Sequence, residues 1–176
     1  MARGRGGRGC ARWAPERSSS RDLPPAEVEL RRANADDLPA VEALLSAGGL
    51  PTEGVASYIE DFIVAESDGQ PVGAIGIETY GKYGLLRSAV VAKEWQGKGV
   101  GRSLVERLLE ETSSRGISSV YLLTTTAEDY FPSFGFSRVD RSTVPDELME
   151  SAEFHGACPA SATVMHRSAR VASRPQ

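Results

Sequence analysis

Residues 84–116 read GLLRSAVVAKEWQGKGVGRSLVERLLEETSSRG, and this stretch is the most informative about the fold. Its first part, 85–92, is apolar apart from two residues, which predicts a buried strand. Residues 101–114 carry leucines at helical spacing and end near Gly116, which predicts an amphipathic helix. A glycine-rich turn joins the two, so the sequence predicts a strand, a tight turn and a helix in direct succession.

The turn itself reads QGKGVGRS. Glycines let backbone N–H groups approach an anion closely, and the N-terminal end of a helix adds a partial positive charge. We therefore expect a diphosphate site here, made by Gln96, Gly97, Lys98, Gly99, Val100, Gly101, Arg102 and Ser103. A P-loop does not fit, because Lys98 is followed by Gly99 and not by Ser or Thr. A dinucleotide-binding fold does not fit either, because hairpin strands precede the motif where repeated βαβ units are expected.

The pattern around this stretch predicts short strands interleaved with helices. The strands expected outside it are 27–32, 63–66, 72–78, 120–123, 136–139 and 161–166, and the helices are 34–47, 58–62 and 128–134. Residues 67–70 have the chemistry of a hairpin turn, and no internal repeat is present. This order predicts an α/β (α+β) fold with one mixed central sheet flanked by helices.

Length and composition bound the protein class. The chain has 176 residues, 40% hydrophobic and 25% charged, which is ordinary for one globular domain. No apolar run approaches the roughly 20 residues of a membrane helix, so we expect no membrane span. The net charge of −4 gives no reason to expect nucleic-acid binding by the protein as a whole.

The first 25 residues differ from the rest. They are rich in Arg, Gly, Ser and Pro, which predicts a disordered leader at 1–25, followed by a domain at 26–168 and a flexible tail at 169–176. The leader lacks the apolar stretch of roughly 7 to 15 residues that a secretory signal needs, and we expect a cytoplasmic protein. A solvated tail, an upstream start codon, an organelle transit peptide and an RNA-contacting Arg-Gly arm are all compatible with it.

Several motifs resemble those of a known family. Gln96, Gly99 and Gly101 match the Q/R-x-x-G-x-G/A motif of the GNAT N-acetyltransferases, and AEDYFPSFGF (127–136) resembles the family's second conserved block. The resemblance covers about residues 27–168. GLLRSAVV, LLTTTAEDYF and EFHGACPASATVM further resemble the GNAT subfamily associated with arsenic resistance, which is itself similar to the acetyltransferase domains of N-acetylglutamate synthases.

The resemblance implies acetyl-CoA as co-substrate. In the family, the diphosphate lies at the motif that residues 96–103 match. The backbone groups that hold the acetyl end correspond to Ala89, Val90 and Val91, where the strand splays. A pantetheine-contacting asparagine that is frequent in relatives corresponds to Thr124, whose hydroxyl replaces it in part.

Two departures concern proton transfer. Many relatives have a glutamate base where this chain has Leu85, and a tyrosine acid where it has Phe131. Tyr130 is the remaining candidate for the acid, although it lies one position before the usual tyrosine and so on a different helical face. Glu78 and Tyr80 are then the nearest candidates for water-mediated deprotonation, although a hairpin-end carboxylate and a packed aromatic ring explain them equally well.

Arg87 interrupts an apolar strand beside the expected acetyl site. A buried charge needs a partner, which is either an internal carboxylate or an oxyanion of the substrate held bidentately. The resemblance to the synthases favours the substrate. Thr125 and Thr126 end a strand near the same place and are further substrate-binding candidates. We expect no metal, since His155 and His166 are isolated.

The sequence thus predicts an acetyl-CoA-dependent N-acetyltransferase acting on a small amine that resembles an amino acid. By resemblance, an organoarsenical amino acid is one candidate substrate. A non-catalytic acyl-CoA-binding regulatory module of the same fold is the alternative. An RNA-associated acetyltransferase, guided by the leader, is a third hypothesis. A homodimer is compatible with all three.

Overall fold

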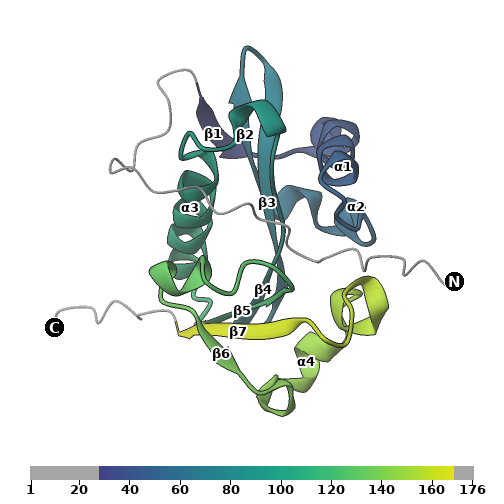
Figure 1. Ribbon diagram of the computed structural model, residues 1–176, viewed down its shortest axis with the longest axis vertical. Coiled ribbons are helices and arrows are strands. Elements are labelled where there is room, and N and C mark those ends of the chain that lie inside the picture. Colours follow the sequence, from purple (N-terminus) through teal and green to yellow (C-terminus); the bar gives the residue numbers. More distant parts are fainter. Residues whose placement is uncertain (1–27, 169–176) are drawn as a thin grey trace, which may run out of the picture.

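The computed structural model describes residues 28–168, which form one seven-stranded mixed sheet (Figure 1). The strand order is β1-β2-β3-β4-β5-β7-β6. The strands are β1 (Glu29–Arg32), β2 (Phe62–Ser67), β3 (Gln70–Tyr80), β4 (Tyr83–Val91), β5 (Ser119–Thr124), β6 (Ser137–Val139) and β7 (Thr163–Ser168). All neighbours pair antiparallel except β4 and β5, which are parallel. The predicted α/β fold with a single mixed sheet is confirmed. The predicted leader and tail lie outside the described residues.

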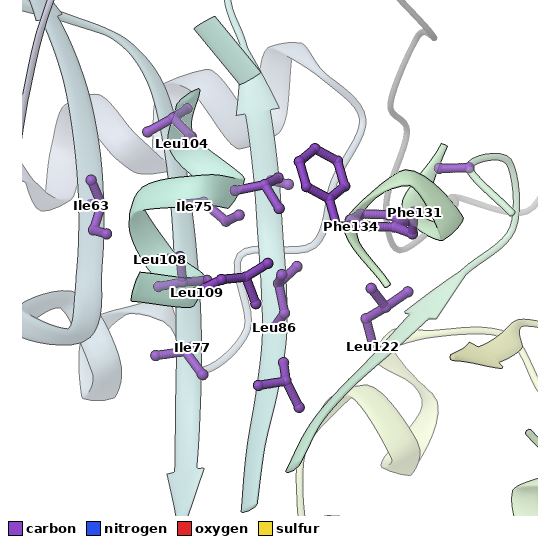
Figure 2. Packing of buried hydrophobic residues seen from close by; sticks show 14 of the residues in the cluster. Ile63, Ile75, Ile77, Leu86, Leu104, Leu108, Leu109, Leu122, Phe131 and Phe134 are labelled. Atoms are coloured by element: carbon purple, nitrogen blue, oxygen red, sulfur yellow. The ribbon is translucent and has the colours of Figure 1, made fainter. Parts of the chain in front are cut away.

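Helix α3 (Val100–Ser114) covers one face of the sheet, called the first face below (Figure 1). Because α3 is the long crossover between the parallel strands β4 and β5, its apolar side packs directly on the sheet. Figure 2 shows this cluster, which contains Leu104, Leu108 and Leu109 of α3, Ile63, Ile75, Ile77, Leu86 and Leu122 of the sheet, and Phe131 and Phe134.

Two separate segments cover the opposite face, called the second face. Helices α1 (Leu38–Ala47) and α2 (Val55–Tyr58) pack on one part of it, against Phe62, Val64, Ala74 and Val90. The segment 144–162, with helix α4 (Asp146–Met149), packs on the other part, against Leu85, Tyr121 and Leu123. The second face is thus covered by two pieces of chain that are far apart in sequence.

Helix boundaries follow the expected signals with some corrections. Asn34 and Asp37 form a capping box at the start of the helix expected at 34–47, but the first turn is a 3-10 helix (Ala35–Asp37) that leads into α1. The helix expected at 58–62 begins earlier, as α2, and continues as a 3-10 turn at Ile59–Asp61. The helix expected at 128–134 is only a 3-10 turn, Phe131–Phe134.

Between residues 140 and 160 the sequence predicted no element. The structure has a 3-10 turn (Arg141–Thr143), helix α4 and a kinked π-helical turn, η6 (Glu153–Ala157), in this segment. No periodic pattern marks elements this short. Among the helices within residues 28–168, none combines the length and apolarity that crossing a bilayer requires.

Strand β4 bends where it passes the end of β5. Two residues, Ser88 and Ala89, lie opposite Ile75 of β3, so β4 carries a β-bulge, and Ser88 adopts a φ of +58°. The parallel pairing with β5 ends at Leu86 and Leu122. Residues 87–91 therefore continue without β5 alongside, and the sheet opens between the carboxyl ends of these two strands, where open α/β sheets bind their ligands.

Candidate active site

The glycine-rich turn adopts the geometry that its sequence predicts. Gly97 and Gly99 have φ values of +78° and +80°, in the left-handed region that favours glycine. Gly99 is the N-cap of α3, and the backbone N–H groups of the first helical turn follow it directly. A 15-residue helix that begins on a glycine turn at the open end of β4 fits a diphosphate group.

The side chains of this turn mostly fix its shape. The Gln96 amide donates to the carbonyl of Val91 at 3.1 Å and ties the turn to β4. The Ser103 hydroxyl donates to the carbonyl of Gly99 at 3.0 Å. Val100 is fully buried, and its side chain packs in the hydrophobic core. These residues belong to the expected diphosphate site through the loop geometry that they maintain.

Two cationic side chains lie at the same turn. Lys98 is exposed, with its Nζ 4.8 Å from the centre of the Trp95 ring. Arg102 is half-buried and forms an ion pair with Glu106 at 3.1 Å. Both side chains carry positive charge to the start of α3, and their contact with a phosphate stays a prediction.

The opening beside β4 is bordered by the residues expected to hold the acetyl end. Ala89, Val90 and Val91 have buried side chains, and Val90 and Val91 pair with β3 on their other edge. Thr124, at the end of β5, is fully buried. Its hydroxyl accepts a hydrogen bond from the N–H of Ala127 at 3.0 Å, so it stabilises the turn after β5.

Thr125 and Thr126 follow at the same end of β5. Thr125 is half-buried and Thr126 is exposed. They lie beside the opening, and their contact with substrate stays a prediction.

A buried ion pair lies on the second face at the level of the opening. Arg87 of β4 is 2% exposed and donates through Nη1 to Oε1 of Glu78 on β3, which is 1% exposed. Arg87 also donates to the carbonyl of Glu53 at 2.5 Å and to the Ser88 hydroxyl at 3.1 Å. Of the two partners considered for Arg87, the structure supplies the internal carboxylate. A further contact with substrate stays a prediction.

Two tyrosines extend this polar cluster. The hydroxyl of Tyr80 donates to Oε2 of Glu78 at 2.7 Å and lies 3.4 Å from the hydroxyl of Tyr58. Burial, reinforced by these hydrogen bonds, raises the pKa of Tyr80 well above its ordinary value. Tyr80 therefore stays protonated at neutral pH and acts as a hydrogen-bond donor, not as a base.

The two apolar residues that stand in place of the family's base and acid, Leu85 and Phe131, both lie in the core. Leu85 is fully buried and lies directly opposite Glu78 in the β3–β4 register. Phe131 is fully buried, with Phe136 at 5.6 Å and Tyr130 at 5.4 Å between ring centres. Tyr130 is half-buried against the same cluster. Its role as the acid stays a prediction.

The sequence analysis did not single out Glu153, in the turn η6. This residue is 2% exposed, and within residues 28–168 its Oε2 has no hydrogen-bond partner. Burial raises the pKa of Glu153 to about 8; the positive charge of Arg87 opposes this effect and the negative charge of Glu78 adds to it. In the sequence, Glu153 is only an acidic residue at the start of the EFHGACPASATVM stretch, and no periodic pattern there predicts its burial.

The histidines lie apart. His155 is exposed, while His166 stacks on Tyr121 with 4.6 Å between ring centres, and burial lowers its pKa. In the described part of the chain, no group of three His, Cys, Asp or Glu side chains is arranged to hold a metal ion.

Comparisons with known proteins address the family directly. Residues 59–138 match the model of the acetyltransferase (GNAT) domain. An uncharacterized N-acetyltransferase of Chlorobaculum tepidum is 30% identical over 134 residues, which cover 72% of this chain and 86% of that protein. The chain belongs to the GNAT acetyltransferase family. It is therefore an enzyme of the N-acetyltransferase class, as the sequence predicted.

Other GNAT relatives are named for amino acids. An amino-acid acetyltransferase of Mycobacterium tuberculosis is 29% identical over 131 residues, covering 69% of this chain and 75% of that protein. The structure of N-acetylglutamate synthase from Neisseria gonorrhoeae, complexed with coenzyme A and N-acetyl-glutamate, superimposes with a TM-score of 0.70 at 23% identity. That match covers 82% of this GNAT chain but 36% of the synthase chain, and it establishes the shared fold.

Proposed function

We propose that this GNAT protein is an acetyl-CoA-dependent N-acetyltransferase whose acceptor is the amino group of a small, carboxylate-bearing compound resembling an amino acid. The observation that carries the proposal is the continuous path from bulged β4 to the glycine N-cap of α3, beside the point where β5 parts from β4. This geometry suits an extended thioester whose diphosphate lies at Gly97 and Gly99.

The proposed reaction has three requirements: polarisation of the acetyl carbonyl, deprotonation of the amine and departure of the sulfur. Acetyl-CoA supplies an activated acetyl group, which a neutral amine attacks at the carbonyl carbon. We expect backbone N–H groups of residues 89–91 to polarise that carbonyl, and one such donor typically contributes about 3 kcal/mol to transition-state stabilisation. The amine must lose a proton, and the sulfur must leave as a thiolate or be protonated.

The deprotonation is the step for which the chain departs from its relatives. Leu85 cannot accept a proton, and Glu78 on the adjacent strand is engaged by Arg87 and Tyr80. Glu78 can act through water only if that ion pair opens. Tyr80 then serves to orient Glu78, because its own proton is held tightly.

The acceptor class rests on the relatives and on Arg87. Amino-acid acetyltransferases are among the relatives, and a buried arginine on the second face is suited to a carboxylate or another oxyanion. The resemblance of residues 84–91, 122–131 and 153–165 to the arsenic-associated subfamily makes an organoarsenical amino acid one candidate acceptor.

The test is release of free thiol from acetyl-CoA in the presence of paired amines. Each amino acid is compared with the amine that lacks its carboxylate, and an organoarsenical amino acid is included. Turnover of the carboxylate-bearing member of each pair is expected. Binding of acetyl-CoA without turnover of any amine would instead support the non-catalytic acyl-CoA-binding module, an alternative favoured by the apolar residues Leu85 and Phe131.

A further inference from the structure

Glu153 is a buried carboxyl group whose counterion the described chain does not supply. It is 2% exposed, its Oε2 has no hydrogen-bond partner within residues 28–168, and its N–H is bonded to the Ser151 hydroxyl at 3.2 Å. A buried polar group without a partner is costly, and such groups concentrate where a ligand completes the site.

The charges around Glu153 indicate the charge of the ligand that would pair with it. The charged groups that act on it are Arg87 of β4 and Glu78 of β3. These two are already paired with each other, so their charges cancel. An ionised Glu153 would therefore give the buried cluster a net charge of −1, which a cation would neutralise.

The position of Glu153 is on the acceptor side of the sheet. Its neighbour Phe154 packs against the cluster that contains Leu85, the position at which many relatives carry their general base. Turn η6 covers the second face from one side, and Gly54, next to the Arg87 guanidinium, covers it from the other. Glu153 thus lies near the position of the missing base. It belongs to the covering segment, whereas the usual base would belong to β4.

We propose that Glu153 binds the ammonium group of the amino substrate and accepts its proton, in place of the base that Leu85 cannot provide. This inference rests on the proposed function and names the group that recognises the amine. An ammonium is the cation that the buried carboxylate lacks. The neighbouring pair of Arg87 and Glu78 keeps the surroundings polar without neutralising Glu153.

Two protons leave the substrate nitrogen in the proposed reaction. One proton passes from the substrate ammonium to the carboxylate of Glu153, leaving a neutral amine and a carboxylic acid. The amine nitrogen attacks the acetyl carbon, the C–N bond forms, and the C–S bond breaks with its electron pair going to sulfur. As the amide forms, the second nitrogen proton passes to the departing thiolate, giving the free thiol of coenzyme A, and Glu153 returns the first proton to solvent.

Access to Glu153 requires a covering segment to move, because Glu153, Arg87 and Glu78 are each at most 2% exposed. The backbone bonds that shape the turn are local. Phe154 and His155 donate to the Ser151 carbonyl, and Cys158 donates to the Glu153 carbonyl at 3.2 Å. None of these backbone bonds joins the turn to a strand of the sheet.

The first test is kinetic and uses the full chain with an amine that it acetylates. Glu153→Gln is close to isosteric and should lower kcat/KM for the amine by about 100-fold or more, the usual contribution of a general base. Its dissociation constant for coenzyme A should change less than about twofold. Glu150→Gln, at an exposed position of the same segment, is the matched control and should behave like the unmodified enzyme. Unchanged amine turnover in Glu153→Gln would overturn the proposal.

The second test does not depend on turnover. With its pKa raised to about 8, Glu153 is mostly protonated at pH 7, so pairing with an ammonium should release a proton. Calorimetric titration of the amine in two buffers of different ionisation enthalpy measures this release. Glu153→Gln should bind the amine more weakly and release no proton. Amine binding without proton release by the unmodified protein would also overturn the proposal.

These tests separate the two hypotheses. If the unmodified protein binds an amine with proton release but acetylates nothing, the proposed function fails and the ammonium site stands. If the protein acetylates amines and Glu153→Gln is fully active, the function stands and the site fails. If Glu153→Gln does not fold, Glu153→Asp together with the proton release of the unmodified protein decides the question. Absence of any amine binding rejects both.

Discussion

Arg87 and Glu78 form an ion pair across adjacent strands, with both side chains almost completely removed from solvent. In the register of β3 and β4, Arg87 lies opposite Gly76 and Glu78 lies opposite Leu85, so the two are diagonal neighbours on one face of the sheet. The ring of Phe62 fills the space over Gly76, where a Cβ would lie 2.3 Å from it. The core therefore encloses the pair at the end near Phe62.

Removing Arg87 should destabilise the protein. Arg87→Leu leaves Glu78 buried without its partner, and breaking a buried pair in this way typically costs about 3–5 kcal/mol of unfolding free energy. The double variant Glu78→Leu/Arg87→Leu should recover much of this loss, because no unpaired charge then remains. Chemical denaturation of the two variants and the unmodified protein measures both effects.

The same variant tests the role of Arg87 toward substrate. If Arg87 also holds a substrate carboxylate, the folded fraction of Arg87→Leu should use amino substrates less well by about 2–4 kcal/mol while binding acetyl-CoA normally. Equal losses for both ligands, together with lowered stability, would restrict Arg87 to its structural role beside Glu78.

The glycine turn should govern coenzyme A binding. Gly99→Glu places a side chain and a negative charge at the left-handed N-cap of α3 and should abolish binding, because both the backbone geometry and the charge oppose a diphosphate. Gly116→Glu is the matched control. Gly116 follows the same helix, has a φ of +77° and has open space at its Cβ, so its backbone strain is comparable. Calorimetry should show normal binding for Gly116→Glu, and equal losses in the two variants would argue against the loop assignment.

Glu153 should make stability depend on pH. Its pKa is raised from the ordinary value of 4.5 to about 8, so the folded state holds a proton that the unfolded state releases. Its favourable contribution is complete below about pH 4.5 and is lost as the pH rises to about 8. The Tm of the unmodified protein should therefore fall relative to that of Glu153→Gln between these pH values. Parallel Tm curves for the two proteins would show that Glu153 is not buried as described.

The sequence predicted those features of the fold that depend on local pattern. The apolar run at 85–92 located a buried strand, and the glycines at 97 and 99 indicated the tight turn before α3, where the structure has the left-handed φ values that glycine adopts without strain. The motif residues Gln96, Gly99 and Gly101 pointed to the family, because the strand, turn and helix that carry them follow one another directly in the chain.

The contacts within the candidate site could not be predicted from the sequence, because they depend on pairing across the sheet. Whether Arg87 meets Glu78 is decided by the β3–β4 register and the bulge at Ser88, which no local pattern specifies. Glu153 was missed for a related reason. It lies in a short π-helical turn, and its burial depends on how residues 144–162 fold back over β4.

Phe131 lies where many relatives carry the acid that protonates the leaving thiolate, and its apolar ring predicts a pH profile with a single limb. Coenzyme A is a thiol with a pKa near roughly 8.5 and leaves readily as a thiolate, whereas the attacking ammonium must first lose a proton. The rate at saturating amine should therefore rise with pH and then level off. Phe131→Tyr should not add an alkaline limb in the present packing, since Phe131 is fully buried among Tyr130, Phe134 and Phe136. A hydroxyl placed there without a partner should instead lower stability by about 1–3 kcal/mol. A bell-shaped profile whose alkaline limb disappears in Tyr130→Phe would contradict this account and identify Tyr130 as the acid.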